Sequence, residues 1–150
     1  MQLTNIARDI REDAEMGRRY LPSDWVGALE PDDILRAGLH PASQDYKAVI
    51  AGAEKLLVLA DRYYESGRRG LSYLPVRAHL SIGVAGMVYR AIGLKLRRNA
   101  LNWAGPRTVT TTSEKFLASL TALPSLVSRG TASRVYHDRT LHTALFGYVR

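Results

Sequence analysis

An apolar stripe with helical spacing constrains the fold of this 150-residue chain more than any other feature. Between residues 42 and about 67, apolar side chains recur mostly at steps of three or four residues, which is the period of one buried helix face. They are Val49, Ala53, Leu56, Leu57, Ala60, Tyr63 and Tyr64. The spacing predicts one long helix that packs this face against the rest of the chain.

A second long helix is predicted after the break "GLSYLP". Pro75 stands where a helix can begin, and the run to about Arg98 carries apolar residues that should face inward. These are Leu80, Val84, Met87, Val88, Ala91 and Ile92. Two long helices joined by a short loop pack antiparallel. Because no alternating strand pattern or internal repeat is present, the sequence predicts an all-α fold.

Shorter helices are predicted before this pair. Residues 3–15 hold good helix formers and should end at Gly17, and Ser23 or Asp24 could cap the next helix. Residues 30–41 predict one small helix, because proline stands near its start and glycine at its end.

A further helix is predicted after the pair. The polar loop of residues 102–115 contains a Gly-Pro step, and Ser113 could cap a helix that runs to about Val127. Residues 129–150 show no clear period, so no structure is predicted there.

Composition excludes several classes of protein. The absence of cysteine excludes disulfides, zinc–thiolate sites and thiol catalysis, and with no secretory signal it favours the cytoplasm. The most apolar segment, residues 79–94, is interrupted by Arg90 and is too short to span a membrane. The net charge of +7 suits an anionic partner. Nucleic acid is not expected, because the basic residues are scattered among acidic ones without an aromatic platform.

Four polar residues near the start of the chain share one predicted helix face. At about 100° per residue, they fall within a stripe about 80° wide. They are Gln2, Asn5, Asp9 and Asp13. Carboxylate and amide oxygens suit hard cations such as Mg²⁺, which often bridge to substrate phosphates. The alternative is a solvated helix face whose acids pair with Arg8, Arg11 and Arg18.

The stretch that carries this stripe, "QLTNIARDIREDAEMGRRYLP", resembles the second aspartate-rich motif of the squalene and phytoene synthases, the head-to-head prenyl transferases. "YYESGRRGLSYLPVRAHLSIGVAGMVYRAIG" resembles the stretch that comes after it in phytoene synthases. The resemblance runs from Met1 to about Lys115. It implies the C-terminal part of the isoprenoid synthase helical fold, with residues 1–128 as half of the catalytic domain and 129–150 as a tail. The chain would then begin mid-helix and lack the N-terminal half with the first aspartate-rich motif.

The resemblance also implies an activity. Two geranylgeranyl diphosphates would be condensed head to head, through prephytoene diphosphate, to 15-cis-phytoene in carotenoid biosynthesis, although the fragment alone would be incomplete. Mg²⁺ is the expected cofactor, with Mn²⁺ as a substitute, and no nicotinamide cofactor is expected. Two alternatives stay open: a squalene or dehydrosqualene synthase that uses farnesyl diphosphate, and a catalytically inert helical interaction or regulatory domain.

The resemblance implies site residues position by position. Asp9 and Asp13 would bind the metal with Asn5, and Tyr89 would line the catalytic site. The residues expected to contact the prenyl diphosphate are Gln2, Asn5, Arg8 and Arg107. Without the family resemblance, Tyr89 is interpreted as a core tyrosine, Arg107 as a solvated loop residue, and Arg8 as a partner of Glu12.

Two further expectations concern lipid. Because a C20 substrate partitions into bilayers, we expect peripheral membrane association through basic side chains. These are Arg97, Arg98, Arg134 and Arg139. A prenyl-chain tunnel or ordinary core packing would each explain a set of apolar residues in the helical pair. The set is Leu56, Leu57, Val84, Met87 and Val88.

Overall fold

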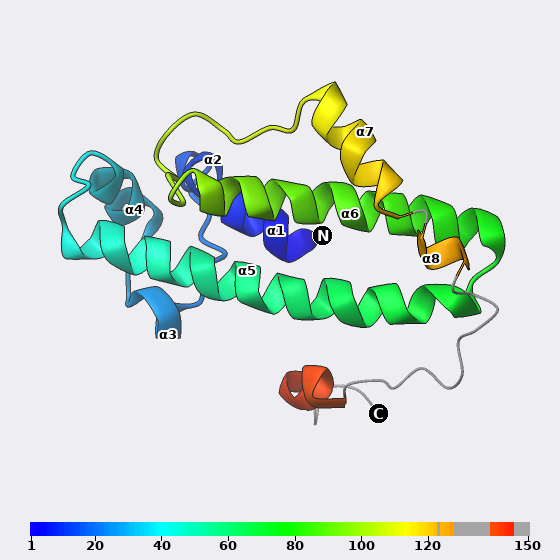
Figure 1. Ribbon diagram of the computed structural model, residues 1–150. Coiled ribbons are helices and arrows are strands. Elements are labelled where there is room, and N and C mark those ends of the chain that lie inside the picture. The colour runs from blue at the N-terminus through cyan, green and yellow to red at the C-terminus, as the bar shows by residue number, and fades with distance from the viewer. Residues whose placement is uncertain (123, 128–138, 146–150) are drawn as a thin grey trace.

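A computed structural model describes residues 1–122, 124–127 and 139–145 of the chain, and these ranges are all-α. Two long helices form its centre, α5 (Gln44–Gly70) and α6 (Val76–Arg98), joined through the 3₁₀ turn η1 (Leu71–Tyr73). They run side by side in opposite directions (Figure 1). The predicted fold class and the antiparallel pair are confirmed.

Helix α5 follows the predicted apolar stripe closely. Ser43 caps it, because its Oγ accepts a hydrogen bond from the backbone N of Tyr46 at 3.1 Å. The stripe residues from Val49 to Ala60 are buried, whereas Tyr63 is 42% exposed. The side chains of the stripe therefore line one side of the core along most of α5.

Helix α6 has the predicted bounds, but its inward face is only partly the predicted one. Leu80 was expected to point inward and is instead 37% exposed, so this part of the prediction is wrong. The buried side changes along the helix: the first half buries His79 beside η1, where its Nδ1 lies 2.8 Å from the Leu71 carbonyl oxygen. The second half buries Ile92 and Leu96 in the main core. A single apolar stripe along α6 cannot face both η1 and the main core, because these lie on different sides of the helix.

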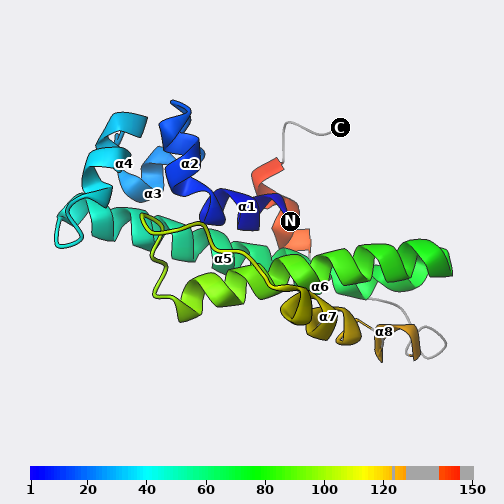
Figure 2. The ribbon, with the colours of Figure 1, turned by 90° about the horizontal axis from the view of Figure 1, so that it is seen from above.

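The helix predicted for residues 3–15 is bent into α1 (Gln2–Arg8) and α2 (Ile10–Glu15). Asp9 lies at the bend with φ −103° and ψ 20°. Helix α1 lies against both α5 and α6 (Figure 2), where it buries Thr4 and Ala7. The chain then turns at Gly17, whose φ of 68° favours glycine and matches the predicted stop.

Two short helices complete the N-terminal part, α3 (Ser23–Val26) and α4 (Pro31–Gly38). The prediction that Ser23 or Asp24 caps a helix is wrong, because both lie in the first turn of α3 and Pro22 is its N-cap residue. The predicted small helix is confirmed as α4, which packs on α2, while α3 packs on α5.

After α6, the described chain forms α7 (Thr112–Leu120), α8 (Pro124–Val127) and the 3₁₀ segment η3 (Arg139–Leu145). The N-cap is Thr111 rather than Ser113, since Thr111 Oγ1 accepts from the Glu114 backbone N at 3.2 Å. The predicted single helix to Val127 is wrong as well. Proline lacks a backbone N–H and disfavours a helix interior, so Pro124 opens a separate helix. None of the helices described here has the length and apolar character needed to cross a membrane.

Candidate functional site

Asp9 lies between two arginines. Arg8 donates two hydrogen bonds to it, from Nε to Oδ1 and from Nη2 to Oδ2, both 2.6 Å long. Arg107 approaches from the loop between α6 and α7, 98 residues further along the chain, with Nε 2.9 Å from Oδ1 and Nη2 3.3 Å from Oδ2. Arg8 thus pairs with Asp9 rather than with Glu12. The structure brings together three of the residues that sequence analysis singled out.

The two aspartates of the motif have opposite electrostatic surroundings. Burial raises the pKa of Asp9, but the hydrogen bonds and positive charges of Arg8 and Arg107 outweigh burial and hold that pKa below its ordinary value. Burial also raises the pKa of Asp13, and the negative charge of Asp9 raises it further, against the weaker opposing effect of Arg18. One carboxylate is neutralised by arginines, while the other lacks comparable compensation.

The oxygens near Asp9 and Asp13 suit a hard cation by their chemistry. The Asp13 carboxylate accepts no hydrogen bond from the residues described, and Asn5 Oδ1 is buried without a partner among them. Gln2, at the start of α1, is exposed. Within the described ranges, however, no group of three or more Asp, Glu, His or Cys side chains is arranged to hold a metal ion. The chain therefore offers two carboxylates and one amide, and two carboxylates are what a phosphate-bridging Mg²⁺ commonly takes from one side of a site.

Surface ion pairing accounts for only part of the predicted polar face. Arg11 pairs with Glu15 one turn later, at 2.8 Å, and its Nη1 also donates to the Ala104 carbonyl oxygen at 3.2 Å. Arg11 therefore stabilises the exposed side of α2 and the start of the Arg107 loop. Asp9 pairs with Arg8, as the ion-pairing alternative expects, and also with Arg107, which that alternative does not include.

Tyr89 lies on α6, half-buried against the core. Its hydroxyl group is near enough to influence Arg107: the hydrogen bond to Asp9 is the main cause that raises the pKa of Arg107, and Tyr89 adds to the same shift. Tyr89 is therefore both a core-packing tyrosine and a neighbour of the charged cluster.

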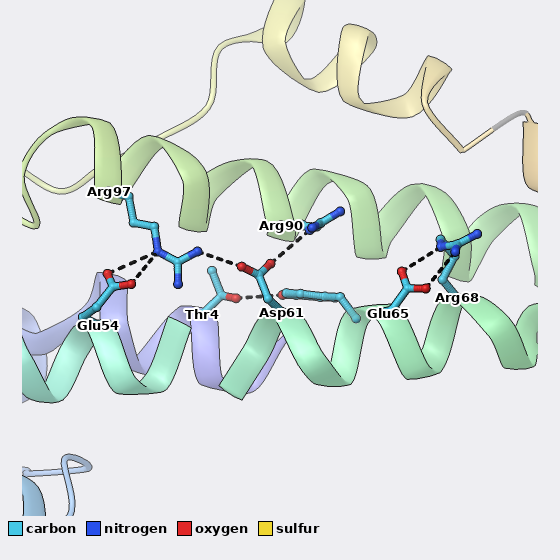
Figure 3. A network of polar contacts seen from close by, with 8 residues as sticks. Thr4, Glu54, Asp61, Glu65, Arg68, Arg90 and Arg97 are labelled. Carbon is cyan, nitrogen blue, oxygen red and sulfur yellow. Dashed lines mark hydrogen bonds and ion pairs between the residues drawn. The ribbon is translucent and has the colours of Figure 1, made fainter. Parts of the chain in front are cut away.

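A second charged cluster joins α5 to α6 and was missed by sequence analysis (Figure 3). Asp61 accepts hydrogen bonds from Arg90 at 3.0 Å and from Arg97 at 2.7 Å, and Arg97 also donates to Glu54 at 3.0 Å. A signal for it was present: two acids stand seven residues apart on one predicted helix, and two arginines stand seven apart on the next. Residues so spaced lie on the same helix face.

Helix α1 is joined to α5 by a partly buried hydrogen bond. Thr4 is fully buried, and its Oγ1 lies 2.7 Å from the Tyr64 hydroxyl oxygen (Figure 3). Because Thr4 directly precedes Asn5 and lies five residues before Asp9, this bond holds the start of the candidate site in place.

A cavity of about 200 Å³ lies between α5 and α6 beside Met1. Its lining is mainly apolar and includes Tyr64, Ile82 and Met87. Of the residues proposed for a prenyl tunnel, Met87 lines this cavity, whereas Leu56 and Leu57 belong to the closed core. Core packing therefore accounts for Leu56 and Leu57, and a place for Met87 in a prenyl tunnel stays a prediction.

Comparison with known proteins identifies the relatives of this chain. The family model for squalene/phytoene synthases matches residues 1–114. The 15-cis-phytoene synthase of Enterobacter agglomerans is 42% identical over 132 residues, which cover 85% of this chain and 43% of the relative. The 15-cis-phytoene synthase of Pantoea ananas is 40% identical over 121 residues, covering 81% of this chain and 38% of the relative. No solved structure matches. The chain spans less than half the length of these relatives, and the resemblance predicted from its motifs is confirmed.

Proposed function

The chain belongs to the squalene/phytoene synthase family, and from this premise we propose that it supplies the diphosphate-binding wall of a phytoene synthase. That enzyme would condense two geranylgeranyl diphosphates to phytoene through prephytoene diphosphate. In this proposal, residues 1–128 form the C-terminal half of the catalytic domain and 129–150 a tail. The first aspartate-rich motif would come from a part of the domain that this sequence does not contain.

The observation that carries the proposal is the position of Asp9 between Arg8 and Arg107, with Asp13 one turn away. A diphosphate needs cations to hold it, and guanidinium groups bind phosphate oxygens in a bidentate manner. Arg107 is 45% exposed and comes from a loop, so its side chain can turn from the Asp9 carboxylate to a phosphate. Gln2 is exposed on α1 and would contact the same group.

The metal in this proposal is Mg²⁺, or Mn²⁺ in its place, held by Asp9 and Asp13 with the amide oxygen of Asn5. When bound, the ion supplies positive charge that stabilises the departing diphosphate. The residues of this chain orient the diphosphate and exclude water from the prenyl chain, for which the apolar cavity beside Met87 offers a wall. Tyr89 would line the site between the diphosphate and this apolar cavity. No reduction is part of this reaction, so the proposal includes no nicotinamide cofactor.

The substrate class leads to a location. A C20 prenyl chain partitions into bilayers, and we propose that the protein associates peripherally with the cytoplasmic membrane surface. Of the basic residues expected to take part, Arg98 is exposed, whereas Arg97 is engaged by Glu54 and Asp61. Arg134 and the side chain of Arg139 lie outside what the structure describes.

A product assay tests the proposed activity. The chain is co-expressed with the part of the Pantoea ananas enzyme that it does not span, and phytoene is measured from geranylgeranyl diphosphate with Mg²⁺. We expect product from the pair, and a loss of at least about 100-fold when Asp9 and Asp13 are both changed to alanine. Asp32→Ala, an exposed aspartate in the first turn of α4, is the matched control and should retain activity.

The assay also separates the alternatives. Product from farnesyl diphosphate alone would identify a squalene or dehydrosqualene synthase. A pair that assembles but forms no prenyl product would favour the inert interaction domain. That second candidate is supported by one observation: both oxygens of Asp9 are already engaged by arginines, which compete with a metal ion.

A further inference from the structure

The charge of the chain is divided unequally along its length. Residues 1–65 contain twelve acidic and eight basic side chains, whereas residues 66–127 contain nine basic side chains and one acidic residue, Glu114. The first segment forms α1 to α4 and most of α5, and the second forms α6, α7 and α8. Figures 1 and 2 place α2, α3 and α4 near one end of the helical pair, and α7 and α8 toward the other. Six of these nine basic residues stand on α6 or α7, and three of the six are paired with acidic side chains: Arg90, Lys95 and Arg97.

Helix α7 adds an exposed apolar face to this basic segment. Phe116, Leu117 and Leu120 are 67%, 66% and 43% exposed, and at about 100° per residue they fall within about 100° of one another. The opposite side of α7 is held on α6 by Glu114, whose carboxylate accepts hydrogen bonds from Lys95 Nζ at 2.9 and 3.0 Å. This ion pair orients α7 so that the three apolar side chains point away from α6.

Three cations of this segment are exposed and make no ion pair with any residue that the structure describes: Arg77, Arg98 and Lys115. Lys115 directly precedes Phe116 on α7. Arg77 and Arg98 lie near the two ends of α6, the helix on which α7 packs. An exposed apolar face on a helix that also carries an unpaired cation is the pattern of helices that lie in the interface of an anionic bilayer. An apolar surface that is covered by protein is instead depleted of lysine.

We propose that the outer face of α7 is the surface by which this protein docks on anionic membranes, with Phe116 and Leu117 inserted among the lipids and Arg77, Arg98 and Lys115 on the headgroups. This inference rests on the proposed peripheral association and names the face that makes it. Helix α7 would then lie at the headgroup level, with α6 between it and α5.

The test uses the full chain and single cysteine labels, because the protein contains no cysteine of its own. An environment-sensitive fluorophore is attached to Phe116→Cys or, as the matched control, to Leu39→Cys. Leu39 is 77% exposed at the end of α4, in the acidic segment. With vesicles of equal phosphatidylglycerol and phosphatidylcholine at low salt, we expect a blue shift and a several-fold gain in intensity for the label at 116, and no change at 39. Pure phosphatidylcholine should give a much smaller response.

Co-sedimentation with the same vesicles measures the charge contribution. Lys115→Glu with Arg98→Glu should lower the bound fraction at least about fivefold, because each cation near an anionic surface contributes to binding. Lys47→Glu, an exposed lysine in the acidic segment, should leave it unchanged.

Three results would overturn the inference in different ways. If the chain binds vesicles but the label at 39 responds instead of the label at 116, another face docks, while peripheral association stands. If the label at 116 is already shielded without vesicles and the chain is oligomeric, the face is a protein interface. If no variant binds vesicles at any salt, peripheral association itself fails, which the product assay would not reveal.

Discussion

Asp9 and Asp61 each accept hydrogen bonds from two arginines, but those arginines come from different places. The partners of Asp61, Arg90 and Arg97, both stand on α6, and Arg97 is held by Glu54 as well. The partners of Asp9 are its neighbour in the chain, Arg8, and a loop residue, Arg107. The same pairing chemistry therefore joins two helices in one place, and in the other it forms the site that we propose exchanges its carboxylate for an anion.

The surroundings of the two aspartates reinforce this difference. Burial raises the pKa of Asp61, but the hydrogen bonds from Arg97 and Arg90 outweigh it, so the pKa is lowered, as it is for Asp9. Each has a second carboxylate one turn away, but the pKa of Asp13, near Asp9, is raised, whereas the pKa of Glu65, near Asp61, is lowered because Arg68 and Arg69 pair with it. The site near Asp9 still holds negative charge for a cation to neutralise, whereas Asp61 lies among charges that are already matched.

The largest effect on stability is expected from Arg97→Gln. The change leaves Glu54 and Asp61 without their shared partner, and we expect the free energy of unfolding to fall by about 1–2 kcal/mol. Urea denaturation measures the loss. Arg98→Gln, at the next position but exposed, should change the stability by less than about 0.5 kcal/mol. Equal losses for the two variants would show that the cluster does not join the helices.

A somewhat smaller effect is expected from Arg107→Gln, on binding rather than on stability. We expect the Kd for inorganic pyrophosphate with Mg²⁺ to rise about fivefold to tenfold, or about 1–1.4 kcal/mol, because a charge-assisted contact is lost. Titration calorimetry measures it, with Arg77→Gln as the control that leaves the Kd unchanged. Weakening by both variants alike would mean that net charge, and not the Asp9 cluster, attracts the anion.

Removing the hydroxyl group that fixes α1 should cost about 1 kcal/mol. Tyr64→Phe leaves the buried Thr4 hydroxyl without its partner. Tyr63→Phe is the neighbouring control: its hydroxyl donates to the Leu141 carbonyl oxygen at 2.8 Å, and the residue is partly exposed, so water can replace the bond. Thermal unfolding of both variants gives the comparison, and a larger loss for Tyr63→Phe would contradict the assigned role of Thr4.

The smallest effect concerns Glu65, which pairs with Arg68 and Arg69 on α5. The hydrogen bond from Arg68 is the main cause that lowers the pKa of Glu65 from 4.5 to about 2. A depressed carboxyl pKa stabilises the fold above the unfolded-state pKa, and this contribution is lost as the pH falls from 4.5 toward 2. Solvent screens the exposed pair, so we expect Glu65→Gln to cost less than about 0.5 kcal/mol at about pH 6 and still less at about pH 3.5. A cost that grows on acidification would contradict the direction of the shift.

The long helices were predictable because their determinants are local. The stripe from Val49 to Ala60 and the break before Pro75 place the ends of α5 within about three residues and those of α6 at the predicted positions. The exposure of Leu80 was not predictable, since it depends on α6 changing its packing partner midway. The bend at Asp9 was missed for a related reason: residues 3–15 contain no proline or glycine to mark it.

The candidate site, too, was predictable only where its determinants are local in the sequence. Helical spacing placed Asp9 and Asp13 together, but periodicity cannot connect Asp9 with a loop residue 98 positions later. Only the family resemblance pointed to Arg107. The pairing of Thr4 with Tyr64 had no local signal, because a buried threonine and a half-buried tyrosine on separate helices resemble ordinary core residues.

The bend at Asp9 leaves the backbone hydrogen bonds intact on both sides of it. The Asp9 amide donates to the Asn5 carbonyl oxygen and the Asp13 amide donates to the Asp9 carbonyl oxygen, each at 2.8 Å. In hydrogen exchange this stretch would behave as one protected segment, although it points along two axes. Asp9 lies where the two axes meet and Asp13 lies on the second, so an ion bound to both carboxylates would fix the angle between α1 and α2. Metal binding would then change the angle between α1 and α2, and this angle could be measured with and without the ion.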